Sequence, residues 1–422
     1  MENFYYDIPT KIHFGSGQIR HLAEAIKNCG HAVLLVYGGG SILHNGVYND
    51  VITQLKEARI PYQELSGVEP NPRYTSIDCG AELCRAHNLD VILAVGGGSV
   101  IDCAKVIAAS VNHEGSSWEL MLDRTRVQSV LPIVAVVTAA GTGSEMDSGA
   151  VISNLETKQK ISIGRTDMYP RYTIMDPSYT FSVSPRQTAA GIADMMSHTF
   201  ELYFNRTTHL VMSNHMCEAI LKTCIECGPI ALSSPSDYNA RAELLWASAW
   251  AINGFLRCGR LGAWSCHPME HPLSAWYDIT HGVGLAILTP RWMRYILKKD
   301  SNTVSAFGSG AVSAVYYADK LFTPVATTLI YSISVVLFPK YNLTYSQVNA
   351  QEYKRYVGGT VENTLFVILP FSALFSAFAV PIIHVLFESG NFNTVSTQMT
   401  SSVFAMYALG MAGFCVLDLI NK

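Results

Sequence analysis

The sequence predicts an α/β domain with a parallel sheet, then an all-helical metal-binding domain, then a membrane-like helical segment. Short apolar strands alternate with amphipathic helices in the first part of the chain, the pattern of a parallel sheet with helices on its faces. Histidines and one aspartate gather in the helical stretch that follows, and charged residues become scarce after about residue 300. We expect the domains to be 1–183, 184–299 and 300–422, with the middle one incomplete.

Three strand–turn–helix units support the first domain. Residues 32–37 form an apolar run that ends in G-G-G-S and precedes a helix-like stretch to Arg59. Residues 91–95 repeat this arrangement before a helix at 100–110, and residues 131–138 form a third strand. Ligands of parallel sheets bind at the carboxyl ends of the strands, which is where these glycine turns lie.

The glycine turns predict a dinucleotide site. Glycine lets phosphate groups approach the backbone, and the following helix presents free N–H groups and a positive dipole end. The second turn reads G-G-G-S at 96–99, and Thr138 and residues 142–144 follow the third strand. The consensus G-x-G-x-x-G is absent from these turns, so they do not indicate an ordinary Rossmann enzyme.

The helical stretch 191–203 carries Asp194 and His198 four residues apart, on one face of the helix. Such a pair is typical either of a simple hydrogen bond or of two ligands to one metal ion. One carboxylate and several imidazoles suit Fe(II) or Zn(II) rather than calcium or magnesium, so we expect a metal site. The segment 266–282 supplies the additional imidazoles, from His267, His271 and His281.

The composition argues against several classes. The net charge is -4 and the pI about 6.3, so no basic surface recommends nucleic acid as a partner. The ten cysteines do not have the regular spacing of a disulfide framework, which suits a reducing compartment. Cys224 and Cys227 form a lone C-x-x-C, which does not suit a structural zinc site. The first residues do not resemble a signal peptide, and we expect residues 1–299 to be cytoplasmic.

The end of the sequence is unusually apolar. Charged residues make up 15 % of the chain, against about 25 % in typical globular proteins. The runs 363–387 and 389–417 carry no formal charge and are long enough to span a bilayer, while 321–339 is marginal. A buried soluble helix explains any one run, but three in succession favour about three membrane spans. We expect membrane association through 321–420, and a membrane location for 300–422.

Up to about residue 297, the motifs resemble those of the iron-containing alcohol dehydrogenases, in particular the NADP-dependent butanol or aldehyde reductase type. They are P-T-K-I-H-F-G-S-G-Q-I (9–19), Y-G-G-G-S (37–41), E-P-N-P (69–72), G-G-G-S-V-I-D (96–102), T-A-A-G-T-G-S-E (138–145), G-I-A-D-M-M-S-H (191–198), and H-P-M-E-H-P-L (267–273) with H-G-V-G (281–284).

The resemblance implies a metal-dependent enzyme that moves hydride between NADP(H) and a small alcohol or aldehyde. The metal, iron or zinc, polarises the carbonyl oxygen as hydride arrives. The metal ligands implied are Asp194, His198, His267 and His281, and His271 has a proton-transfer role near the nicotinamide. NADP is favoured because the turn after residue 37 has no acid before Asp50 to bind a ribose 2′-OH. The cofactor-lining positions implied are Gly38, Gly39, Ser41, Asn71, Gly97, Gly98, Ser99, Thr138, Thr142 and Lys160.

From about residue 301 the chain resembles a fragment of the MviN-type flippases for lipid-linked peptidoglycan precursors. The matching stretches include 305–321, 336–340, 386–392 and 407–410. Only about three spans are present, against more than a dozen in that family, so transport activity has no basis in the residues.

Three interpretations therefore stay open. The chain is an oxidoreductase whose last helices are replaced, or a membrane transport fragment with a soluble appendage, or an inactive fusion of two coding segments. The first interpretation accounts for every residue with identifiable chemistry. We expect weak activity from the whole chain, because the helices that close the metal domain in the family are replaced after residue 297. A homodimer is the candidate assembly.

Overall fold

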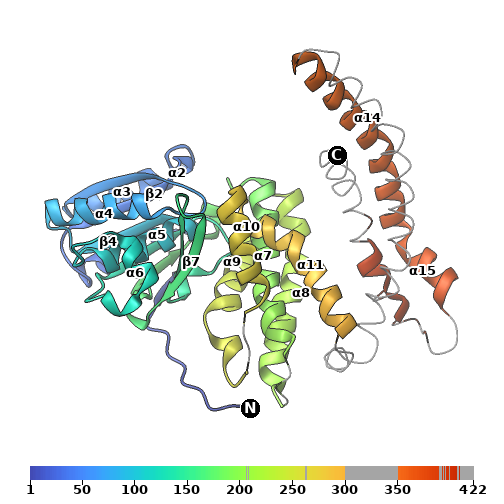
Figure 1. The fold of residues 1–422 in the computed structure, drawn as a ribbon, viewed down its shortest axis with the longest axis horizontal. Helices are drawn as coiled ribbons and strands as arrows, with labels where there is room; N and C mark the ends of the chain where they lie inside the picture. Colours follow the sequence, from blue (N-terminus) through green and yellow to red (C-terminus); the bar gives the residue numbers. More distant parts are fainter. Residues whose placement is uncertain are drawn as a thin grey trace. The chain divides into compact units, whose positions relative to one another are not determined.

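The protein divides into two compact units, Met1–Ile296 and Leu297–Lys422. The computed structural model describes residues 1–299 apart from 206, 208, 262 and 263, then 350–388, and scattered positions from 392 to 408 (Figure 1).

Six parallel strands form the main sheet of the first unit, in the order β1-β8-β5-β4-β2-β3. The non-consecutive order requires crossover connections, and helices supply them. The central strands are nearly continuous apolar runs, as expected for a sheet covered on both faces. The strands are β1 (Lys11–Phe14), β2 (Val33–Gly38), β3 (Tyr62–Val68), β4 (Val91–Gly96), β5 (Ile133–Val137) and β8 (Tyr172–Met175).

Each face of this sheet has its own apolar core. Leu34 and Ile92 belong to one core, and Val33 and Val91 belong to the other, because successive side chains of a strand point to opposite faces. All four side chains are fully buried. The covering helices of this part are α1 (Leu22–Lys27), α2 (Ser41–His44), α3 (Val47–Glu57), α4 (Tyr74–His87), α5 (Gly98–Ser110) and α6 (Ser117–Leu122).

A two-stranded antiparallel hairpin, β6 (Gly149–Asn154) and β7 (Gln159–Gly164), stands apart from the main sheet. Figure 1 shows β7 beside α10 (Cys266–Tyr277), and the two elements pack together. The hairpin therefore joins the sheet-containing part of the unit to its helical part. The alternation of strands and helices in the sequence does not indicate this hairpin.

The helical part begins after β8 and packs around its own apolar core. Met195, Leu202, Cys217, Ile220 and Leu244 are buried there. Ser184 caps the first of these helices by accepting a hydrogen bond from the Gln187 amide at 3.3 Å. Besides α10, the helices are α7 (Pro185–Tyr203), α8 (Val211–Ser233), α9 (Tyr238–Ile252) and α11 (His281–Lys299).

The described part of the second unit contains α14 (Ala350–Ala377) and α15 (Ala379–Phe387). No single helix among the described residues is both long and apolar enough to cross a bilayer. The segments Glu362–Ala377 and Ala379–Phe387 meet that test only together, with a bend of 63° between them. The expected span at 321–339 lies outside the described residues, and most of 389–417 does too.

The predicted parallel sheet followed by a helical part is confirmed. The predicted strands correspond to β2, β4 and β5, each within two residues at either end. The run 363–387, which we expect to be long enough to span a bilayer, forms two helices that break at Phe378 and meet the length and composition test only as a bent pair.

Candidate metal and dinucleotide site

Two buried side chains on α7 face the same point. Asp194 and His198 are separated by one helical turn, and His198 Nε2 lies 3.5 Å from Asp194 Oδ1. His267, the second residue of α10, places its Nε2 atom 3.5 Å from the same oxygen. His281, the first residue of α11, places its Nε2 atom at 3.8 Å. Three helices thus bring four predicted ligands around one carboxylate oxygen.

Two of these atoms lack the partner that buried polar groups normally have. Within the described part of the chain, Asp194 Oδ1 and His267 Nε2 are buried without a hydrogen bond. Such atoms are costly unless something else satisfies them. The donor atoms of Asp194, His267 and His281 lie within 4.8 Å of one another, close enough to share an ion. One carboxylate with imidazoles is a donor set for Fe(II) or Zn(II), so the residues fit such an ion.

Two further buried carboxylates hold the imidazoles in orientation. The Glu201 carboxylate accepts a hydrogen bond from Nδ1 of His267, and it also accepts the Cys266 amide at 2.6 Å. The Glu270 carboxylate likewise contacts Nδ1 of His281. A metal-ligating histidine usually donates its second ring N–H to such a group, which fixes its tautomer. In both histidines the Nε2 atom is thereby left facing Asp194.

The charges of the cluster suit a cation. Burial acts to raise the pKa of Asp194, but His198 and the neighbouring imidazoles outweigh it and hold that pKa below its ordinary value. Burial lowers the pKa of His198 to about 3, against the opposing effect of Asp194. Burial also acts to lower the pKa of His267, but the carboxylates of Asp194 and Glu201 outweigh it and raise the pKa to about 9. Metal binding would therefore displace a proton from His267.

A cavity of about 530 Å³ opens beside these ligands, within the range of small-molecule sites. Ten of the predicted site residues line it: Asn71, Gly98, Ser99, Thr142, Lys160, Asp194, His198, His267, His271 and His281.

Five predicted cofactor-lining residues are outside the cavity lining, namely Gly38, Gly39, Ser41, Gly97 and Thr138. They lie at or just beyond the carboxyl ends of β2, β4 and β5. Because those strands are parallel neighbours, the five residues follow the same edge of the sheet.

The turn after β4 is shaped by close contact. A β-carbon at Gly98 would lie 2.1 Å from the hydroxyl oxygen of Thr142, so only glycine fits there. This contact brings the N-terminus of α5 against the loop after β5. Free helix N–H groups at such a position suit a phosphate.

Lys160 connects the hairpin with the metal cluster. Its ammonium donates to Asn71 Oδ1 at 2.9 Å and lies 3.5 Å from Glu270 Oε2. Burial lowers the pKa of Lys160 although Glu270 opposes this. His271 lines the same cavity, and burial, followed by the charge of Lys160, lowers the pKa of its imidazole to about 3. His271 is therefore neutral at pH 7.

Sequence reasoning missed Glu201, Glu270 and Trp264. The spacing of the two glutamates could have identified them: Glu201 lies three residues after His198, and Glu270 three residues after His267, so each lies on the same helix face as a ligand. Trp264 had none. Its ring meets that of His267 edge-on, with centroids 4.9 Å apart, and it lines the cavity.

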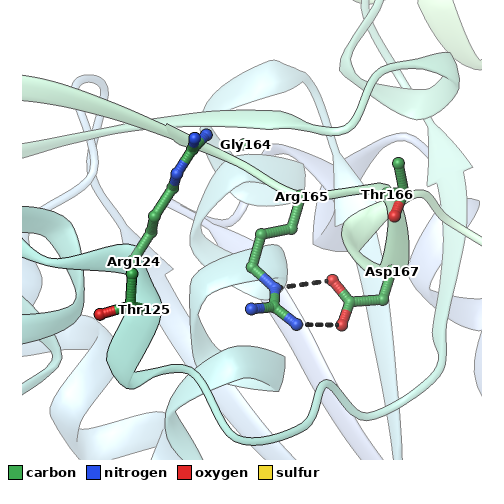
Figure 2. Close-up of a pocket in the computed structure, with 6 residues that line it drawn as sticks. All are labelled: Arg124, Thr125, Gly164, Arg165, Thr166 and Asp167. Atoms are coloured by element: carbon green, nitrogen blue, oxygen red, sulfur yellow. Dashed lines mark hydrogen bonds and ion pairs between the residues drawn. The ribbon is translucent and has the colours of Figure 1, made fainter.

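A second hollow, of about 310 Å³, is lined by Arg124, Thr125 and residues 164–167, and shares Gly164 with the first cavity. Figure 2 shows Arg165 and Asp167 facing each other, with two hydrogen bonds of 2.9 and 2.8 Å. The charge of Arg165 is therefore already compensated. The hollow contains none of the predicted site residues.

Three family models match the chain. Iron-containing alcohol dehydrogenase matches residues 9–177, and the C-terminal model of the Fe-containing alcohol dehydrogenase family matches 188–312. The lipid II flippase MurJ matches residues 300–422. The dehydrogenase match thus runs beyond the expected limit near residue 297 and overlaps the flippase match.

Individual relatives agree with these matches. NADH-dependent butanol dehydrogenase A of Clostridium acetobutylicum is 55 % identical over 71 % of this chain and 77 % of its own length. The NADPH-dependent aldehyde reductase YqhD of Escherichia coli is 37 % identical over 69 % of this chain and 75 % of its own. The crystal structure of NADH-dependent butanol dehydrogenase A from Thermotoga maritima has a TM-score of 0.70 and 42 % identity, covering 72 % of this chain and 76 % of that one.

Proposed function

The chain belongs to the iron-containing alcohol dehydrogenase family between residues 9 and 312, and on this basis we propose that it is a metal-dependent oxidoreductase acting on a small alcohol or aldehyde with a nicotinamide dinucleotide. One observation carries the proposal beyond family membership. Asp194 Oδ1 and His267 Nε2 are buried without hydrogen bonds in the described structure, next to a cavity that also reaches the glycine turn at Gly98.

Each residue has a defined role in this proposal. Asp194, His198, His267 and His281 hold Fe(II) or Zn(II). The bound ion would polarise the substrate oxygen, and the dinucleotide would supply or accept hydride. His271 lines the cavity and is neutral at pH 7, and we assign its imidazole the proton transfer. The cofactor-lining residues of the sheet edge bind the dinucleotide.

We propose NADP(H) rather than NAD(H) as the preferred cofactor. The turn after β2 reads G-G-G-S and carries no carboxylate that would bind a ribose 2′-OH and repel a 2′-phosphate. The relatives are of both kinds, since the butanol dehydrogenases are named as NADH-dependent and YqhD as NADPH-dependent. A direct comparison of kcat/KM with NADPH and NADH decides the matter. An equal or reversed preference contradicts the 2′-phosphate argument and leaves the dinucleotide site intact.

The domains follow from these roles. We propose that residues 1–183 bind the dinucleotide, residues 184–299 bind the metal, and residues 300–422 form an apolar segment. We place the first two in the cytoplasm and expect the last, which the flippase model matches, to associate with a membrane. A homodimer remains our proposed assembly.

A second candidate function is that of a flippase-like membrane fragment. The MurJ match to residues 300–422 favours it, as does the bent apolar pair Glu362–Ala377 and Ala379–Phe387. It assigns no role to the ligand cluster. An inactive fusion of two coding segments is the third interpretation.

The experiment measures NADPH-dependent reduction of butyraldehyde by the detergent-solubilised full chain, loaded with Fe(II) or Zn(II). We expect weak turnover, below about one per second, that requires metal and is lost in His267→Gln. His87→Gln, an exposed histidine on α4, is the matched control and should leave turnover unchanged. Turnover at the usual enzyme rate would show that the C-terminal segment completes the site. Activity that survives metal removal, or a chain that binds neither metal nor NADPH, contradicts the proposal.

A further inference from the structure

Glu270 contacts both halves of the candidate site: the metal half, which holds the four candidate ligands, and the dinucleotide half, which includes the cofactor-lining residue Lys160. Its side chain is completely buried, and its carboxylate contacts three different elements. It accepts a hydrogen bond from His281 on α11 and another from Ser274 on its own helix, α10. It also lies 3.5 Å from the Lys160 ammonium on β7.

Lys160, which contacts Glu270, also lines the cavity. It is also buried, with 3 % of its side chain exposed, and it donates to Asn71 at 2.9 Å. Asn71 in turn donates to the Ile279 carbonyl at 3.1 Å. A buried carboxylate and a buried ammonium are each costly alone, so each constrains the position of the other. His281 is thus linked through Glu270 to two residues that line the cavity.

Glu201 makes a useful comparison because its contacts are confined to the metal half. It accepts from the His267 ring and from the backbone amides of Ser265, Cys266 and His267. No cation of the dinucleotide half contacts it among the described residues. Both glutamates orient one ligand histidine, but only Glu270 also holds a cofactor-lining lysine.

We propose that Glu270 is a positioning residue that couples metal binding to dinucleotide binding. It fixes the His281 tautomer so that Nε2 faces Asp194, and it holds the Lys160 ammonium beside Asn71. The inference rests on the proposed function, because it needs both ligands to occupy their sites. Glu201 positions its histidine without this coupling.

The test uses the full chain and two binding measurements rather than turnover. Co(II) and Zn(II) affinities are measured by equilibrium dialysis, with the visible Co(II) spectrum as a report on ligand geometry. NADPH affinity is measured by fluorescence with and without Zn(II). The variants are Glu270→Gln and its matched control Glu201→Gln, which removes the same charge from the other carboxylate.

We expect both variants to lose about 10- to 100-fold in metal affinity and to alter the Co(II) spectrum. Only Glu270→Gln should also weaken NADPH binding, by about tenfold, and abolish any dependence of NADPH affinity on Zn(II). Unchanged NADPH affinity in Glu270→Gln, or an equal loss in Glu201→Gln, overturns the coupling. A wild-type chain that binds neither ligand instead refutes the proposed function.

A second variant covers the case in which Glu270→Gln fails to fold. Glu270→Gln combined with Lys160→Met removes both buried charges and leaves neither unpaired. We expect this double variant to fold and to bind NADPH no more weakly than Lys160→Met alone, because the coupling is already broken. Additive losses in the double variant would show that the two residues act independently.

Discussion

A β-carbon at Gly191 would lie 2.2 Å from the carbonyl oxygen of Ala140. The α7 helix therefore approaches the loop after β5 as closely as glycine allows. Gly141, the next residue of the same loop, is equally close, since its own β-carbon would lie 2.9 Å from the Gly191 Cα atom. Asp194 follows three residues later on α7, so this contact places the central carboxylate beside the cavity.

Gly191→Ala should therefore move α7 away from the loop. We expect a loss of about 1–3 kcal/mol in unfolding free energy, as for other overpacked sites, together with weaker metal retention. Urea unfolding and metal analysis after dialysis measure the two effects. Gly228→Ala on α8 is the control, because its β-carbon would meet only the side chain of Ile192, at 3.2 Å. Equal stability of Gly191→Ala and wild type would show that the loop yields without cost.

Gly284→Ala tests the space that the Glu270 carboxylate occupies. The added β-carbon would lie 2.6 Å from Glu270 Oε1, so the carboxylate must shift while keeping its charge. We expect a loss of several-fold in Zn(II) affinity with little change in helix content by circular dichroism. The same Zn(II) affinity as wild type would mean that Glu270 can move without releasing His281.

Lys105→Met tests a buried charge network beneath the glycine turns. The Lys105 ammonium is fully buried and donates to Ser144 at 2.8 Å and to the Gly149 carbonyl at 2.6 Å. Ser144 donates in turn to Asp102 at 2.5 Å. Removing the lysine takes its charge from the partly buried Asp102 carboxylate and its donor from Ser144 and Gly149, so we expect a loss of about 1–3 kcal/mol in urea unfolding. Adding Asp102→Asn should restore part of the lost unfolding free energy, because it removes the carboxylate charge. A double variant less stable than Lys105→Met would contradict a charge interaction between the two residues.

Asp90 gives a pH-dependent contribution to stability. Partial burial acts to raise its pKa, but the amides of Ala32 and His31, at 2.7 and 2.8 Å, outweigh it and hold the pKa below its ordinary value. A lowered folded-state pKa stabilises the protein above the unfolded pKa, near 3.9, and this gain is lost as the pH falls through the folded value. The side chain is 41 % exposed, so solvent screening limits the effect to about 1 kcal/mol.

Asp90→Asn should accordingly lower Tm at pH 7 and pH 5 by a similar amount, and the difference from wild type should shrink between pH 4 and pH 3. Glu114→Gln, at an exposed loop carboxylate, is the control. If the Tm difference between Asp90→Asn and wild type grew as the pH fell, the pKa of Asp90 would be raised in the folded protein, which contradicts the prediction.

The sheet was predictable where burial is complete. Strands β2, β4 and β5 are apolar on both faces, so their sequences alone identify them. Strand β3 is at the sheet edge and contains polar residues such as Glu64, which its short pattern does not distinguish from a loop. The β6–β7 hairpin lies outside the main sheet, so the strand–helix alternation gave no indication of it.

In the site, contacts within one helix could be predicted from the sequence, whereas contacts between different elements could not. Asp194 and His198 are one helical turn apart, so their proximity follows from α7 alone. His281 is linked to Glu270 only because α11 approaches α10 at Gly284, and Lys160 joins them from the hairpin. Sequence spacing contains no information about such contacts between elements. The resemblance to a family supplied the ligand set, and it did not supply the two carboxylates behind the ligands.

All four candidate ligands and both orienting glutamates lie between residues 194 and 281, before the second unit begins at Leu297. A nascent chain leaves the ribosome from its N-terminus, and domains generally fold in that order. The residues of the candidate metal site are therefore translated before the apolar segment. We therefore expect the candidate metal site to be able to form before the apolar residues of the second unit leave the ribosome.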